Sequence, residues 1–182
     1  NTNFQTAVNL WFNNEAEANA IYGHIRDWNI SAITNLDGIF QFKEEFNEDI
    51  SAWDTSSVTS MKNTFNGASA FNQNIGNWDV SSVTTLMQAF KNATSFNQNI
   101  GGWNVSSVTN MGGIFDGAVN FDQPIGGWDT SSVTHMGTVF RGAASFNQPI
   151  DDWDLSSVVD FNGMFMNATS FNQPIGNWDI SS

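Results

Sequence analysis

The sequence predicts an α/β repeat protein: a right-handed solenoid of 25-residue units, each with a short strand and a short helix, behind a helical N-terminal cap. The main observation is the spacing of seven of the eight tryptophans, which lie 25 residues apart at positions 28, 53, 78, 103, 128, 153 and 178. A longer phrase recurs with them, since residues 71–83 read FNQNIGNWDVSSV and residues 96–108 read FNQNIGGWNVSSV. Self-similarity at this period is typical of stacked supersecondary units.

Residues 1–27 do not fit the repeat, and we expect them to form a helical cap over the first unit. Apolar residues recur there at helical spacing, namely Phe4, Ala7, Val8, Trp11 and Phe12. Asn13 or Asn14 can begin a second helix, and Gly23 is a suitable end for it. The side of that helix facing the first unit is expected to consist of Ala16, Ala20 and Ile21.

Residues 28–182 are expected to form one continuous solenoid of six 25-residue repeats and a truncated final one. Within a repeat, Ile75, Trp78 and Val80 have the L-x-x-L-x-L spacing of a leucine-rich-repeat strand. Ser81 is a suitable N-cap for the short helix that should follow. The buried face of that helix would be formed by Val83, Leu86, Phe90 and Ala93.

Charge and composition exclude several partners. Eighteen acidic residues against five basic ones give a formal charge of -13, which disfavours nucleic acid and anionic membrane surfaces as partners. No apolar run approaches the roughly 20 residues that a membrane helix needs, so we expect no membrane insertion. Disulfides are excluded because the chain has no cysteine. We expect the sequence to be a segment of a longer protein.

The repeated phrase FNQxIGxWDVSSVTxM, followed by F-x-x-A-x-x-F, resembles the BspA-like, Trp-rich leucine-rich repeat of bacterial surface proteins, mycoplasma lipoproteins and large adhesins. The resemblance covers residues 28–182. It implies an extracellular module on the bacterial cell surface, with an adhesion or ligand-binding role and no catalysis. Its partner would be a protein, peptide or glycan on another cell or surface. The motif is specific for the repeat and does not identify the ligand.

The tryptophan ladder allows two interpretations. The indoles could be buried, each stacked on the next unit with its N–H bonded to a backbone or Asn partner, or they could form an exposed platform for sugars or peptides. Apolar residues flank each tryptophan, as Ile75 and Val80 flank Trp78, and this favours burial.

The residue after each ladder tryptophan is the candidate ligand-binding column on the strand face: Asn29, Asp54, Asp79, Asn104, Asp129, Asp154 and Asp179. If the tryptophan points inward, strand alternation points this column outward. Each carboxylate could accept hydrogen bonds from the Ser-Ser turn that follows it, which would lower its pKa. Alternatively, the column could attract Ca²⁺ or the basic groups of a partner.

The densest acidic spot is a weak candidate for a Ca²⁺ site, formed by Asp151, Asp152 and Asp154. It lacks the spacing and the glycine of an EF-hand loop. No other cofactor is predicted. We also expect no enzymatic activity, because the chain offers no Ser-His-Asp set, no metal-binding histidine cluster and no phosphate-binding glycine loop.

Two further functions compete with ligand binding. A threonine column, ending in Val159, suggests ice binding only weakly, because a flat two-column array is absent. The module could otherwise be a structural spacer or a self-association element. Whichever function holds, a homodimer is expected through the C-terminal end, with an interface that includes Phe165, Phe171, Ile175, Trp178 and Ile180.

Overall fold

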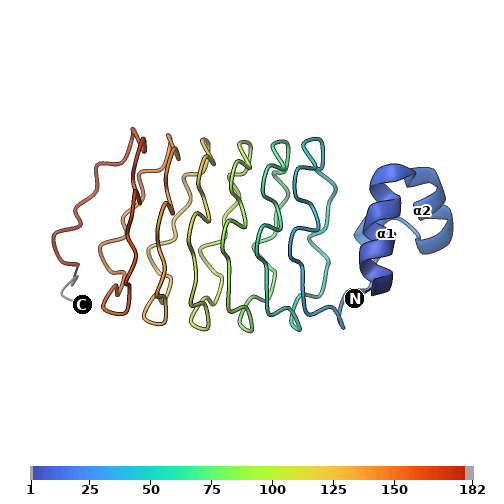
Figure 1. The fold of residues 1–182 in the computed structure, drawn as a ribbon, viewed down its shortest axis with the longest axis horizontal. Coiled ribbons are helices and arrows are strands. Elements are labelled where there is room, and N and C mark those ends of the chain that lie inside the picture. The colour runs from blue at the N-terminus through green and yellow to red at the C-terminus, as the bar shows by residue number, and fades with distance from the viewer. Residues whose placement is uncertain (1, 179–182) are drawn as a thin grey trace.

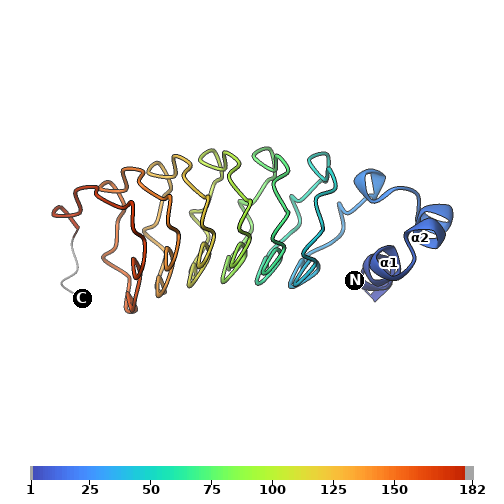
Figure 2. The same ribbon diagram turned by 90° about the horizontal axis from the view of Figure 1, so that it is seen from above.

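The computed structural model describes residues 2–178 as an elongated stack of similar coils with helices at one end (Figure 1). Seen from above, the coils follow one another along the long axis of the stack (Figure 2). We call each coil a rung and number the rungs from the N-terminal end. Rung 1 comprises residues 26–50, rung 2 comprises residues 51–75, and rung 6 comprises residues 151–175.

The helices lie at the N-terminal end of the described chain: α1 (Thr2–Asn13), α2 (Glu15–Tyr22) and the 3-10 helix η1 (Ile25–Asp27). Asn14 caps α2, since its side chain accepts a hydrogen bond from the Glu17 N–H at 3.2 Å. The predicted inner face of α2 is wrong, because Ala18 is the buried residue and Ile21 is 57% exposed. A helix this short is oriented by its cap and its neighbours more than by its own apolar pattern.

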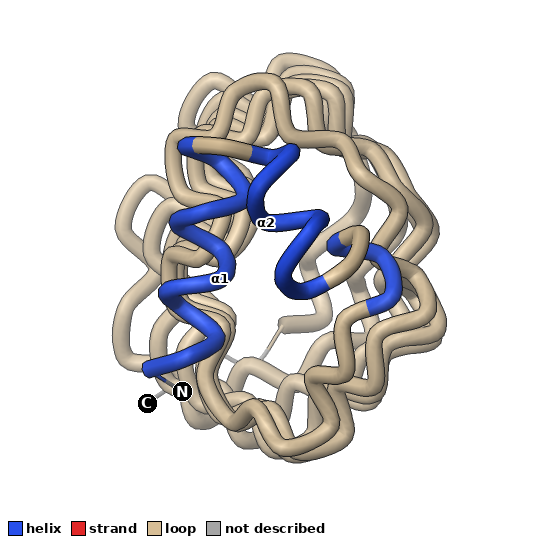
Figure 3. Tube along the Cα trace, turned by 90° about the vertical axis from the view of Figure 1, so that its right-hand side faces the viewer, coloured by secondary structure: helices blue, strands red, loops and turns tan. Residues whose placement is uncertain are grey.

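α1 covers the open end of rung 1, and the end-on view shows both helices lying across that end (Figure 3). The contacts are mostly edge-to-face pairs of aromatic rings, a favoured geometry. Phe12 contacts Phe40 and Phe46 of rung 1, with ring centroids 6.1 and 5.7 Å apart. Trp11, the tryptophan outside the ladder, lies 5.9 Å from Trp28.

The predicted fold class is wrong. Among residues 2–178, helices occur only before Trp28, and no segment forms a named strand. The strand-like pairing between rungs is limited to isolated parallel bridges between residues 25 apart, from Asn35 with Ser60 to His135 with Asp160. The rungs therefore are not the strand-plus-helix units of an α/β leucine-rich-repeat solenoid.

The predicted helix is replaced by overlapping turns. Gln88 and Asn92 have φ values of 56° and 54°, whereas an α-helix needs negative φ throughout. Ala89, Lys91 and Ala93 donate their N–H groups to the carbonyls three residues earlier at 3.0–3.2 Å. The N–H groups that alternate with these donate to carbonyls of the next rung at 2.7–2.9 Å, and they belong to Leu86, Gln88, Phe90 and Asn92.

The same two turn positions have positive φ in all six rungs. In chain order they are Gly38, Phe42, Asn63, Gly67, Gln88, Asn92, Gly113, Gly117, Thr138, Gly142, Gly163 and Asn167. Gly and Asn tolerate this conformation best, and they fill nine of these twelve positions. Their recurrence is therefore the sequence signal for turns in this segment.

The predicted strand is also interrupted by turns. Trp78 donates its N–H to the Ile75 carbonyl at 3.1 Å, and Val83 donates to the Val80 carbonyl at 2.9 Å. Side chains make the inter-rung bonds here: the Trp78 indole N–H donates to the carbonyl of Ile50, 28 residues earlier, at 3.1 Å. The equivalent bonds of the other ladder indoles in rungs 2 to 6 are 2.9–3.2 Å long and come from Trp53, Trp103, Trp128 and Trp153.

The core is a set of aromatic columns parallel to the stack axis. The indoles of rungs 2 to 6 are only 3–4% exposed, so the interpretation of the ladder as buried is confirmed. Trp53 and Trp78 stack with ring centroids 6.2 Å apart and planes within 4°. Within rung 2 and its neighbour, Phe71 stacks on Phe65 at 4.0 Å and on Phe96 at 5.9 Å.

Replacing Trp103 tests how far stability depends on this core. Trp103→Ala should lower the free energy of unfolding by about 3–5 kcal/mol, the usual range for a buried tryptophan. Trp103→Phe keeps an aromatic ring but leaves the Ile75 carbonyl without its indole donor. This variant should therefore lower the free energy of unfolding by about 1–3 kcal/mol. Urea denaturation followed by circular dichroism measures both changes. An unchanged midpoint for Trp103→Ala would contradict the buried ladder.

Candidate functional site

The acidic column lies on the surface, directly after each buried ladder tryptophan. Its described members are all exposed: Asn29, Asp54, Asp79, Asn104, Asp129 and Asp154. Asp179 lies outside the described residues. The column does not lie on a strand face, because this part of the rung forms no strand and lies between two turns.

Each side chain of the column is held by the serine two residues later. The Asp79 Oδ1 accepts the Ser81 backbone N–H at 2.9 Å and the Ser81 hydroxyl at 2.6 Å. Asn104 makes the same two bonds with Ser106, at 3.2 and 2.8 Å. The predicted bonding to the Ser-Ser turn is confirmed, whereas the predicted role of Ser81 as a helix cap is wrong.

These hydrogen bonds keep the carboxylates charged. The serine hydroxyl and then the serine N–H lower the pKa of Asp54, Asp79, Asp129 and Asp154 below the ordinary value of 3.8. Both bonds go to Oδ1, and no described residue donates a hydrogen bond to Oδ2 of these four side chains. Each rung from 2 to 6, except the one with Asn104, thus presents a carboxylate oxygen to solvent.

The structure does not assemble the predicted Ca²⁺ ligands into a metal site. Within residues 2–178, no group of three or more His, Asp or Glu side chains is placed to hold a metal ion. The Asp154 Oδ1 accepts a hydrogen bond from the Ser156 hydroxyl at 2.7 Å. Asp151 and Asp152 do not combine with Asp154, or with any other described His, Asp or Glu, into a set of three metal ligands. The Ca²⁺ prediction therefore depends on the sequence alone.

The threonine column uses its hydroxyl groups within the stack. The hydroxyl of Thr84 donates to the Thr59 carbonyl one rung back at 3.1 Å, and Thr109 donates to Thr84 at 3.2 Å. Thr134 repeats the bond at 3.0 Å. Since the hydroxyl hydrogens point along the stack, this column is better explained as an inter-rung bond than as an ice-binding array.

The C-terminal end of the described stack is open. Phe165, Phe171 and Trp178 are half-buried there and Ile175 is 38% exposed, while Ile180 lies outside the described residues. In every preceding rung, four turn N–H groups donate to the next rung. Within residues 2–178 the equivalent groups of rung 6 have no acceptor, and they belong to Phe161, Gly163, Phe165 and Asn167.

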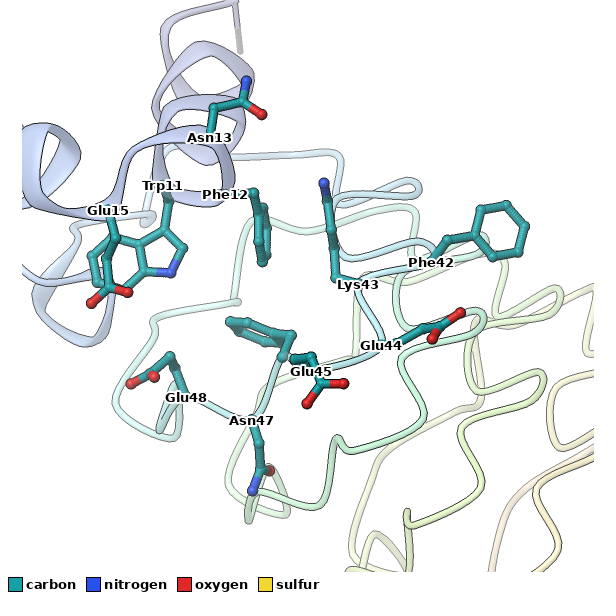
Figure 4. A pocket seen from close by; sticks show the side chains of 11 residues that line it. Trp11, Phe12, Asn13, Glu15, Phe42, Lys43, Glu44, Glu45, Asn47 and Glu48 are labelled. Carbon is teal, nitrogen blue, oxygen red and sulfur yellow. The ribbon is translucent and has the colours of Figure 1, made fainter.

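A pocket that the sequence did not predict lies between the cap and rung 1 (Figure 4). We call it the junction pocket. It has a volume of about 450 Å³, with aromatic walls from Trp11, Phe12 and Phe46. Four carboxylates also line it: Glu15, Glu44, Glu45 and Glu48. Lys43 also lines the pocket, with its Nζ 4.4 Å from the centre of the Phe12 ring.

A departure from the repeat marks this pocket in the sequence. Residues 41–49 read QFKEEFNED, whereas the equivalent residues 66–74 of rung 2 read NGASAFNQN. A consensus of all repeats does not show the charged residues of rung 1, whereas a comparison of rung 1 with each later rung does.

One acidic side chain is buried in the side of the stack. The Asp116 side chain is only 7% exposed and accepts hydrogen bonds from Arg141 Nε at 2.8 Å and Nη2 at 2.5 Å. Lys91 Nζ lies 3.5 Å away on the preceding rung. The Asp116 bond raises the pKa of Arg141 above its ordinary value. These three residues link successive rungs, so we assign them a structural role.

Comparisons with known proteins point to one family. A family model described as "Mycoplasma protein of unknown function, DUF285" matches residues 6–119 and, in a second match, residues 86–182. Searches of curated proteins and of solved structures gave no match. None of the helices in the described part of the chain combines the length and the apolar character needed to span a membrane.

The bonding of the column predicts a pH dependence of stability. Because the folded state lowers these pKa values, the column stabilises the fold above the ordinary value of 3.8, and this contribution is lost as the pH falls through the lowered pKa. Asn cannot be protonated here but still accepts the serine bonds, as Asn104 shows. A variant with Asn at positions 54, 79, 129 and 154 should therefore lose less stability than the parent between about pH 6 and about pH 3. Urea midpoints at both pH values measure this, and equal losses would contradict it.

Proposed function

The chain belongs to the DUF285 family, and on this premise we propose that it is a non-catalytic ligand-binding module of an extracellular bacterial adhesion protein. Its Trp-rich repeat resembles those of BspA-like bacterial surface proteins, which supports a place at the cell surface. The observation that carries the proposal is the acidic column, held in one orientation and exposed along the stack.

The column suits a basic protein or peptide surface. In Asp54, Asp79, Asp129 and Asp154, Oδ1 is fixed by serine, so Oδ2 is oriented before any partner arrives. Preorganised acceptors lose little conformational entropy on binding. Arginine and lysine side chains are the natural donors to such oxygens, and the formal charge of -13 would speed their approach.

An array of basic peptides, acidic peptides and glycans tests this function. We expect the chain to bind basic peptides in preference to the other two classes. The Asn variant at positions 54, 79, 129 and 154 should bind them about tenfold more weakly, because four exposed carboxylates each contribute modestly. Its melting temperature at neutral pH serves as the control for folding. Binding to none of the three classes would overturn the proposal and favour a structural spacer.

Self-association is a second candidate, favoured by the open C-terminal end. Its half-buried rings, and its backbone donors that find no acceptor among residues 2–178, are features that other protein surfaces tend to cover. A second copy meeting the first through a twofold axis would cover both ends at once. On this alternative the chain is a homodimer in solution.

A matched pair of variants tests the dimer. Ile175 at the open end is 38% exposed, and Val119 on the side of rung 4 is 37% exposed. Ile175→Asp should convert the dimer to a monomer, because it places a charge in the apolar interface, and Val119→Asp should not. Sedimentation velocity at high micromolar concentration measures the state of each. A monomeric parent chain, or a dimer that survives Ile175→Asp, would contradict this alternative.

A further inference from the structure

We propose that the junction pocket binds a basic segment of a partner protein, with an arginine or lysine side chain held beside Phe12 by Glu44 and Glu45. The site is separate from the acidic column, since its residues come from α1, from Glu15 at the start of α2 and from residues 42–48 of rung 1 (Figure 4). The inference deepens the proposed function by giving the module a single pocket at one end.

The other rungs show that the stacking of one rung on the next does not require the residues around this pocket. Where rung 1 has Lys43, the following rungs have alanine: Ala68, Ala93, Ala118, Ala143 and Ala168. Where rung 1 has Glu48, they have glutamine: Gln73, Gln98, Gln123, Gln148 and Gln173. Glu44 and Glu45 stand where every later rung has an uncharged residue. The charges of rung 1 thus serve something other than the stacking of rungs. Glu48 Oε2 lies 3.6 Å from His24 Nε2 of the cap segment, whereas Glu44 and Glu45 have no ion-pair partner among residues 2–178.

Phe42 departs furthest from the repeat. It has a φ of 57°, a conformation that disfavours bulky side chains, at a position held by Gly or Asn in the other five rungs. Its side chain is 68% exposed, so burial offsets little of this strain. Figure 4 shows the ring projecting outward beyond the pocket, and a Cβ added to Gly67 would lie 2.7 Å from it. One face of the ring therefore rests on rung 2, and the other extends the binding surface.

The chemistry of the pocket matches a cationic chain. Glu15, Glu44 and Glu45 form no ion pair with any residue in the range 2–178, so their charges face the pocket and solvent. The Lys43 ammonium over the Phe12 ring shows that this wall accepts a cation. The carboxylates are too dispersed for one metal ion but suit the several donors of a basic segment. A volume of about 450 Å³ is in the usual range for ligand pockets.

Binding of a fluorescein-labelled tri-arginine peptide, followed by fluorescence anisotropy, tests the proposal. A tri-citrulline peptide has the same shape without the charge and should bind about tenfold more weakly. The variant Glu44→Ser, Glu45→Ala, Glu48→Gln installs the residues of rung 2 and should weaken tri-arginine binding about tenfold. The control Asp27→Asn, Asp151→Asn, Asp152→Asn removes the same number of charges outside both the junction pocket and the acidic column, and it should leave the affinity within about twofold.

Phe42→Gly separates binding from folding. This variant restores the glycine of rungs 2, 4 and 5, so it should melt at the same temperature as the parent chain or higher. It should nevertheless bind tri-arginine about fivefold more weakly, because the exposed Phe42 ring beside the pocket is lost.

Several outcomes would overturn the proposal. If tri-arginine does not bind, or if the pocket variant binds it as well as the parent chain does, the junction pocket is not the site. If the Asn variant at positions 54, 79, 129 and 154 loses affinity for tri-arginine and the pocket variant does not, the junction pocket is again excluded, while the proposed function of the column stands. Equal losses in both triple variants would indicate attraction by overall charge and no pocket.

Discussion

The structure depends on the alternation of backbone N–H groups between local turns and the next rung. A chain without helices or sheets in its rungs must still satisfy its buried polar groups. Two positive-φ residues per rung make this possible, because they orient every second N–H along the stack axis. Where the backbone cannot reach its neighbour, side chains complete the bonding. The Asn47 Oδ1, for example, accepts the Asn72 N–H at 2.9 Å.

The aromatic core follows from this backbone arrangement. Because each rung repeats the path of the one before, a ring at one position lies over the ring 25 residues later. Phe96 and Phe121 stack at 6.0 Å with planes within 3°, and the Phe115 ring lies 3.8 Å from Phe121. Each ring thus contacts partners within its own rung and in both neighbours. Stability in such a stack is carried from rung to rung.

The period, the buried tryptophans and the serine bonds of the acidic column could be predicted, because each is written in a strict 25-residue repeat. The secondary structure could not be read from apolar spacing. Val83, Leu86, Phe90 and Ala93 are spaced like one face of a helix, yet a series of turns buries the same four side chains. Only the Gly and Asn residues at positions such as Gly113 and Gly117 distinguish the two. The junction pocket was missed for the opposite reason, since it is defined by residues that break the repeat.

The register of 25 residues also makes the surface a grid. A residue's place within its rung sets the side of the stack on which it lies, and its rung number sets its distance from the cap. Inserting or removing one 25-residue unit would therefore change the reach of the stack by one rung height and leave the angular position of every column unchanged. The number of rungs between a side chain and the helical cap therefore fixes the position of that side chain along the stack.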